Sequence, residues 1–174
     1  MVILLIALSL SMDAFSLSLI YGMYKLSKKE EFSLSLIVGI FHFIMPLLGN
    51  NFGILILTII PIKLNILVTL IFLIIGIQMI LDSFKEENYT KIVSIFGNIL
   101  FGLAVSIDSF GVGIGLKYIS SNIYISSIIF SIVSFSLTYI GLIFGKKIGK
   151  KIGKISNIIG GTILIIIGLS YIFK

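Results

Sequence analysis

The stretch Ser11-Met12-Asp13-Ala14-Phe15 recurs in the second half of the chain as Ser106-Ile107-Asp108-Ser109-Phe110. Each copy places an aspartate inside a long apolar segment. Burying an aspartate at the centre of a membrane helix costs about 2.5 to 3.5 kcal/mol, so packing alone does not explain two of them. We infer that Asp13 and Asp108 bind a cation together.

The composition around these motifs is that of a membrane protein. Apolar residues make up 58% of the 174 residues and charged residues only 11%, which indicates an all-α polytopic membrane protein rather than a soluble domain. About 20 helical residues cross the roughly 30 Å hydrocarbon core, so we expect six transmembrane helices. The connections are too short for another domain, so residues 1–174 form a single transmembrane domain. The expected spans are Val2 to Tyr24, Phe32 to Ile60, Leu64 to Leu81, Ile92 to Leu116, Ile123 to Gly145 and Ile155 to Phe173.

The lysines, which are all 13 of the basic residues, predict the orientation. Ten fall in the odd-numbered connections and three on the opposite side. The positive-inside rule therefore places the odd-numbered connections in the cytoplasm and both termini outside. Lys146, Lys150 and Lys154 recur at helical spacing and predict a basic face against the lipid bilayer. A nucleic-acid partner is not expected, because the lysines lie in short turns with no folded domain to present them.

The two halves of the chain resemble each other beyond the aspartates, which are 95 residues apart. Gly49 to Gly53 corresponds to Gly145 to Gly149 at an offset of 96, and Leu73 to Ile77 matches Ile165 to Leu169 at an offset of 92. In the first of these matches, Asn50 and Asn51 correspond to Lys146 and Lys147. The asparagines fall on the side predicted to be outside and the lysines on the side predicted to be cytoplasmic, which supports opposite orientations of the two halves. The pattern indicates a duplicated unit, with chance similarity among Ile-, Leu- and Gly-rich helices as the alternative.

A duplicated unit with three spans must insert its two copies in opposite orientations. We therefore expect two inverted three-helix repeats, 1–82 and 92–174, joined by a short cytoplasmic loop at 83–91. Helical rise then puts Asp13 roughly 16 Å, and Asp108 roughly 24 Å, from the cytoplasmic ends of their spans. Both aspartates would lie in the middle third of the bilayer, where they could face each other across a central site.

Four further residues are candidate metal ligands. Ser16 shares a helical face with Asp13, and the thioether of Met12 would favour a transition metal, although most methionines in apolar helices serve packing. His42 is either a ligand or proton relay, or a hydrogen-bonded residue between helices. Asp82 is either a solvated acid at a helix end or part of the approach to the site.

Pro46 interrupts the hydrogen bonding of the second span. Two outcomes stay open for this stretch: an unwound segment that exposes carbonyl oxygens, or a kink that neighbouring helices accommodate.

Taken together, the motifs resemble those of the MntP-type manganese efflux pumps, within the LysE-like transporter superfamily. The resemblance implies a six-helix exporter of Mn²⁺ in the bacterial plasma membrane, with both membrane aspartates essential. His42 departs from it, because the family has Glu or Gln four residues before the proline. The Ser-Ile-Asp-Ser-Phe motif also resembles a sporulation-associated branch of the superfamily. The resemblance rests on Ser11 to Ala14, Ser106 to Ser109, Met45 to Gly49, Met79 to Asp82, Gly160-Gly161 and Leu164 to Gly168.

Charge accounting suggests how such an exporter would work. In the empty site, repulsion between the two carboxylates favours a shared proton, which a metal ion would displace. We therefore expect proton-coupled antiport, with the metal ion as substrate and no cofactor. The alternatives are an exporter of another cation such as Cd²⁺ or Ca²⁺, or a non-transporting sporulation or assembly protein. A homodimer stays open, and an enzyme is not expected, because the single histidine has no recognisable nucleophile partner.

Overall fold

The computed structural model describes residues 1–24, 26–59, 63–84, 95–148 and 150–172. Within these residues all the regular secondary structure is helical, as predicted. The predicted ends at Ile60, Ile92 and Phe173 lie outside the described residues, as do Lys25, Gly149, Lys174 and most of the loop at 83–91. The helices are α1 (Val2–Gly22), α2 (Lys28–Ile59), α3 (Leu64–Asp82), α4 (Ile95–Ala104), α5 (Ile107–Ile119), α6 (Ile123–Ile148) and α7 (Lys150–Ile172).

Local hydrogen bonds explain where two of the long helices begin. At the start of α2, the backbone N–H of Ser27 donates to the carboxylate of Glu30 at 2.7 Å, and the N–H of Glu30 donates to the Ser27 hydroxyl at 3.4 Å. This reciprocal capping box starts α2 four residues before the predicted Phe32. At the start of α6, the side-chain oxygen of Asn122 accepts from the N–H of Ile125 at 3.1 Å.

The predicted fourth span is not one helix. It breaks at Val105 and Ser106, and α4 and α5 meet there at a bend of 46°. The hydroxyl of Ser106 donates to the carbonyl of Leu103 at 3.1 Å, one of the local hydrogen bonds with which serine competes against a continuous helix. The break places Asp108 in the first turn of α5.

The second span, unlike the fourth, is one continuous helix. Pro46 lies inside the continuous helix α2, so the alternative of an unwound segment there is wrong. A Cβ at Gly113 of α5 would overlap the backbone of Pro46, so the two helices approach each other closely at this point. The irregular backbone of this bundle therefore belongs to the α4–α5 break and not to the proline.

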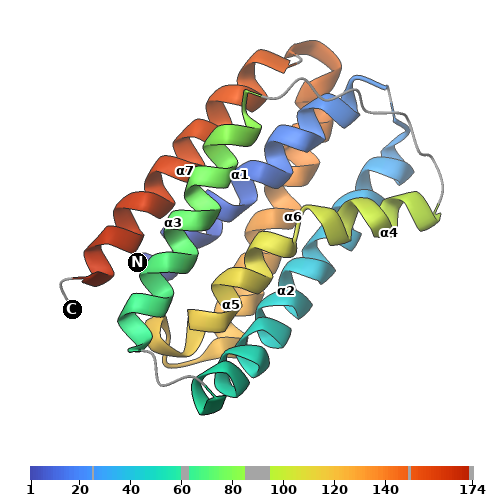
Figure 1. Cartoon of the computed structure of the whole chain (residues 1–174). Coiled ribbons are helices and arrows are strands. Elements are labelled where there is room, and N and C mark those ends of the chain that lie inside the picture. The colour runs from blue at the N-terminus through green and yellow to red at the C-terminus, as the bar shows by residue number, and fades with distance from the viewer. Residues whose placement is uncertain (25, 60–62, 85–94, 149, 173–174) are drawn as a thin grey trace.

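Most neighbouring helices pack through close backbone contacts. α1 lies against α6 and α7, α2 against α5 and α6, and α3 against α7 and α5, while α4 leaves the axis of α5 beside α2 (Figure 1). At several glycines, two on α2 and two on α6 among them, an added Cβ would collide with a backbone carbonyl oxygen of the neighbouring helix. The pairs for α2 and α6 are Gly49 with Phe110, Gly53 with Ile114, Gly141 with Phe15, and Gly145 with Leu19.

These contacts correct the predicted alignment of the two halves. Gly49 has the environment of Gly141, and Gly53 has that of Gly145, which is an offset of 92 residues. The predicted pairing of Gly49 with Gly145 at an offset of 96 is therefore wrong by about one helical turn. Since 50 and 51 then no longer align with 146 and 147, the argument from asparagine and lysine at those positions does not hold.

Among the described residues, five helices are long and apolar enough to cross a membrane, and a sixth span results if the bent α4–α5 pair counts as one. The main buried cluster draws residues from α1, α3, α5, α6 and α7, among them Leu10, Phe72 and Phe130, while the exposed side chains of these helices are largely apolar. An apolar exterior around a packed interior is what a lipid environment requires. The chain is a multi-pass membrane protein.

Candidate metal site

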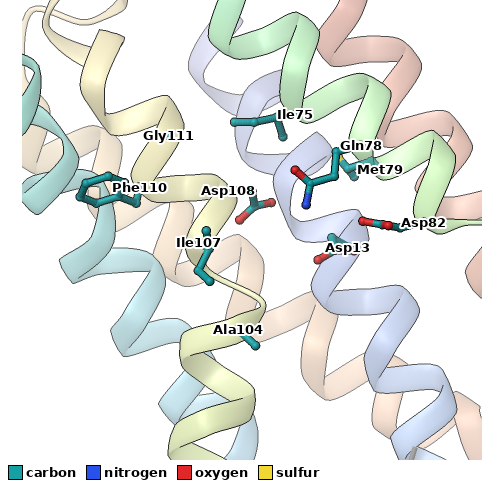
Figure 2. Close-up of a pocket in the computed structure, with 10 residues that line it drawn as sticks. All are labelled: Asp13, Ile75, Gln78, Met79, Asp82, Ala104, Ile107, Asp108, Phe110 and Gly111. Carbon is teal, nitrogen blue, oxygen red and sulfur yellow. The ribbon is translucent and has the colours of Figure 1, made fainter. Parts of the chain in front are cut away.

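Three of the predicted residues line one cavity of about 310 Å³. Asp13 comes from α1, Asp82 from the end of α3 and Asp108 from the start of α5, and Gln78 of α3 adds an amide. Figure 2 shows these four polar side chains around the same space, with Met79 and other apolar residues beside them. The tertiary structure thus gathers the acidic side chains that the sequence singled out.

The α4–α5 break positions Asp108. One carboxylate oxygen, Oδ1, accepts a hydrogen bond from the N–H of Ser109 at 2.7 Å, and the N-terminal turn of a helix favours a negative charge. The other oxygen, Oδ2, is buried and has no hydrogen-bond partner. Asp13 lies close enough to Asp108 to act on it electrostatically. A buried oxygen without a partner at a cavity is a suitable ligand for a positive ion.

Asp13 is held from the opposite side by α7. Its Oδ1 accepts a hydrogen bond from the amide of Asn157 at 3.3 Å, and Asn157 is itself buried. The side-chain oxygen of Asn157 has no hydrogen-bond partner. Because the amide donates to the carboxylate, Asn157 orients Asp13 and compensates part of its charge.

Gln78 and Asn157 were missed in the sequence. Gln78 precedes Asp82 by four residues, so both side chains lie on one face of α3, and Asn157 is a buried amide in an apolar helix. The available signal was the rarity of carboxamides inside membrane spans. Neither residue belongs to a repeated motif, which is why attention to the repeats passed over them.

Three predicted ligands are not part of the cavity lining in this structure. Met12 points to α7, where its sulfur accepts a hydrogen bond from the Ser156 hydroxyl at 2.9 Å. Ser16 is only 5% exposed. His42 is fully buried, with Nδ1 3.0 Å from the carbonyl oxygen of Val38 and Nε2 without a partner. Their predicted roles as ligands stay predictions.

The chemistry of the cavity suits a hard divalent cation. Carboxylate and amide oxygens are ligands for such ions, and Mn²⁺ falls in this class. No three His, Cys, Asp or Glu side chains come together as a metal-binding group anywhere in the described ranges. The volume of the cavity leaves room for water molecules to complete the coordination of an ion.

The fold and this site define a class: a multi-pass helical membrane protein with acidic side chains around a cavity inside its bundle. Residues 25–172 match the model of a family described as "Putative manganese efflux pump". The protein of Bacillus pumilus named "Putative manganese efflux pump MntP" is 34% identical to this chain, over 97% of this chain and 92% of the relative. The protein of the same name in Bacillus licheniformis is 36% identical, over 95% of this chain and 89% of the relative. "Putative manganese efflux pump MntP 1" of Wolinella succinogenes is 34% identical over 95% and 93%.

The chain therefore belongs to the manganese efflux pump family, as the motifs predicted. This is a family of membrane transporters and not of enzymes. No solved structure matches the chain.

Proposed function

We propose that this chain exports divalent metal cations, foremost Mn²⁺, across the bacterial plasma membrane, and that Asp13 and Asp108 bind the ion. One observation carries the proposal: the two repeated aspartates line the same cavity, and a buried oxygen of Asp108 has no other partner. The family of the chain supports manganese as the substrate.

The inverted three-helix repeat is part of the proposal. Contacts that recur at fixed offsets support it. Gly76 on α3 lies against Gly161 on α7. At an offset of 92, the counterpart of Gly76 is Gly168 and that of Gly161 is Thr69, and these two residues also lie against each other. The hydroxyl of Thr69 also donates to the carbonyl of Gly168 at 3.0 Å. Two helices that exchange contacts in this way are related by a two-fold axis, which is the arrangement of inverted repeats in many transporters.

The lysine distribution orients the bundle with the C-terminal end of α3 in the cytoplasm and both termini outside. The cavity lies toward that end of α3, since Gln78, Met79 and Asp82 line it. In this orientation the cavity receives the ion from the cytoplasm. Asp82 is the first carboxylate that the ion meets, and it attracts cations to the mouth of the cavity.

Export needs an energy source. Moving a divalent cation out of a cell with a negative interior costs about 4.6 kcal/mol per 100 mV, from 2.3 kcal/mol per charge. Two protons moving inward would offset this electrical work. Two carboxylates that face each other favour a shared proton when no metal is bound, so we propose that the same aspartates carry protons on the return step.

The experiment measures Mn²⁺ export from cells and from vesicles that contain the full chain, Asp13→Asn or Asp108→Asn. Export should be lost in both variants at unchanged protein level, because an amide keeps the size of the side chain and removes its charge. Thr162→Ala, at an exposed position on α7, is the control. Retained export in both aspartate variants would refute the proposed site, and absence of export by the unaltered chain would favour a non-transporting membrane protein.

Proton coupling is tested separately in the same vesicles. Mn²⁺ movement should be accompanied by proton movement in the opposite direction, followed with a pH-sensitive dye. Manganese movement without any proton counterflow would reject the coupling and leave the metal site standing. Parallel measurements with Cd²⁺ and Ca²⁺ determine which ion the site prefers.

A further inference from the structure

We infer that the ion leaves on the other side through a second path, closed in this structure, which runs between α1 and α7 and is lined by Ser9, Met12 and Ser16. The inference rests on the proposed export function and names the release route that export requires. It follows from comparing three residues that line the open cavity at the α4–α5 break with the residues at the matching places on α1.

The wall of the cavity around the α4–α5 break includes Ala104, Ile107 and Gly111 beside Asp108 and Phe110. Subtracting the offset of 95 that relates Asp108 to Asp13 gives Ser9, Met12 and Ser16. The same offset relates the backbone contacts of the two helices, since α2 touches Phe110 and Ile114 where α6 touches Phe15 and Leu19. The correspondence therefore rests on tertiary contacts as well as on sequence.

The two matching walls differ in exposure. Ala104 is exposed and Ile107 is 61% exposed, whereas Ser9 is completely buried. Met12, the counterpart of Ile107, is half-buried. One wall is therefore open and its counterpart is closed, which is the asymmetry expected of a transporter with inverted repeats in one of its two states.

The closed wall is held by contacts that can be exchanged. The hydroxyl of Ser156 on α7 donates to the sulfur of Met12, and the amide of Asn157 donates to Asp13. A Cβ at Gly160 would lie 2.7 Å from the carbonyl oxygen of Ser9. The contact between α1 and α7 is therefore close. An ion held by the two aspartates can replace the hydrogen bond to Asp13 as the helices separate.

In the second state α7 moves away from α1, and α3 closes on α5. Asp13 and Asp108 exchange places about the two-fold axis and stay at the ion in both states. Met12 and Ser16, which the cavity excludes in this structure, then offer a sulfur and a hydroxyl to the leaving ion. Gln78 and Asp82 belong to the cytoplasmic path only.

The chain contains no cysteine, so single cysteines can report the two paths without a background. The experiment uses the full chain in right-side-out and inside-out vesicles, with a charged, membrane-impermeant methanethiosulfonate reagent. Ser9→Cys probes the closed path and Ala104→Cys, its counterpart, probes the open one. Ser18→Cys is the matched control, because Ser18 is also completely buried on α1 and lies on neither path.

During Mn²⁺ turnover, Ser9→Cys should be labelled from the outside several-fold faster than Ser18→Cys. Conditions that raise this rate should lower the labelling of Ala104→Cys from the cytoplasmic side. A Ser9→Cys variant that exports Mn²⁺ but is labelled no faster than Ser18→Cys would overturn the inference. Changes of both reporters in the same direction would also overturn it.

A second pair, Ser16→Cys with its counterpart Gly111→Cys, keeps the test decisive if a variant of the first pair fails to fold. Failure of the inference and failure of the proposed function give different results. Reciprocal labelling without Mn²⁺ export supports the two paths and rejects manganese as the substrate. Manganese export without reciprocal labelling rejects the second path and leaves the exporter standing.

Discussion

Replacing Gly160 by alanine should push the transporter toward the state in which α1 and α7 are apart. The added Cβ would lie 2.7 Å from the carbonyl oxygen of Ser9 and 2.9 Å from the Cβ of Met12. Ordinary contacts are longer, so α7 must retreat from α1 by about half an ångström. The third neighbour, the terminal methyl of Met79 at 2.8 Å, can turn away because methionine is flexible.

The size of the effect follows from where the strain acts. Overpacking by one methyl group costs about 1 to 3 kcal/mol, and this cost falls only on the state in which α1 and α7 are in contact. The population of the state with α1 and α7 apart, relative to the state with them in contact, should therefore rise by about 5-fold to 150-fold. Labelling of Ser9→Cys from the outside should increase, and labelling of Ala104→Cys from the cytoplasm should decrease.

Gly168→Ala provides a matched control on the same helix. Its added Cβ would lie 2.8 Å from the Cβ of Phe72 on α3, a contact as tight as that at Gly160. The substitution should lower stability without changing the ratio of labelling. The reasoning is refuted if Gly160→Ala folds and leaves the ratio unchanged, or if Gly168→Ala changes it equally.

Three further substitutions test single parts of the site by the Mn²⁺ dependence of efflux from vesicles. Asn157→Leu removes a hydrogen bond to a charged acceptor, and at 3.3 Å this bond falls near the weak end of the usual range, about 1.5 kcal/mol. The apparent affinity for Mn²⁺ should therefore fall about tenfold. An unchanged affinity would exclude a positioning role for Asn157. Asp82→Asn should slow export at low Mn²⁺ and low ionic strength but not at saturating Mn²⁺, because salt screens the attraction between this half-buried carboxylate and an approaching cation. A defect independent of salt would instead indicate direct ligation. His42→Gln should keep the rate of Mn²⁺ export within a few-fold of that of the unaltered chain, since His42 does not line the cavity. Complete loss of export would instead support a role of His42 as a ligand or proton relay.

Much of this architecture was predictable from the order of apolar and charged residues. Continuous apolar runs gave the spans, because backbone groups in lipid must be satisfied within helices. The start of α2 was less accurate, since Ser27 and Glu30 fix it through hydrogen bonds that hydropathy does not detect, whereas α6 begins at the predicted Ile123. The motif resemblance predicted the family, which the comparisons confirmed.

The site was predictable only in part. Asp13, Asp82 and Asp108 line one cavity, as their chemistry suggested, but Gln78 lines it too and Asn157 holds Asp13 from α7. The register of the two halves was also misjudged, because many glycines in an apolar sequence offer several alignments one turn apart. Only the backbone contacts of these glycines distinguish between such alignments.

The sequence by itself determined that this is a multi-pass membrane protein with two repeated aspartates inside its apolar segments. This holds because the free energy of placing each residue in lipid depends mainly on that residue and its near neighbours. The tertiary structure decided where the span around Asp108 breaks and which polar groups surround the aspartates. These features depend on contacts between helices far apart in the chain, which no local pattern encodes.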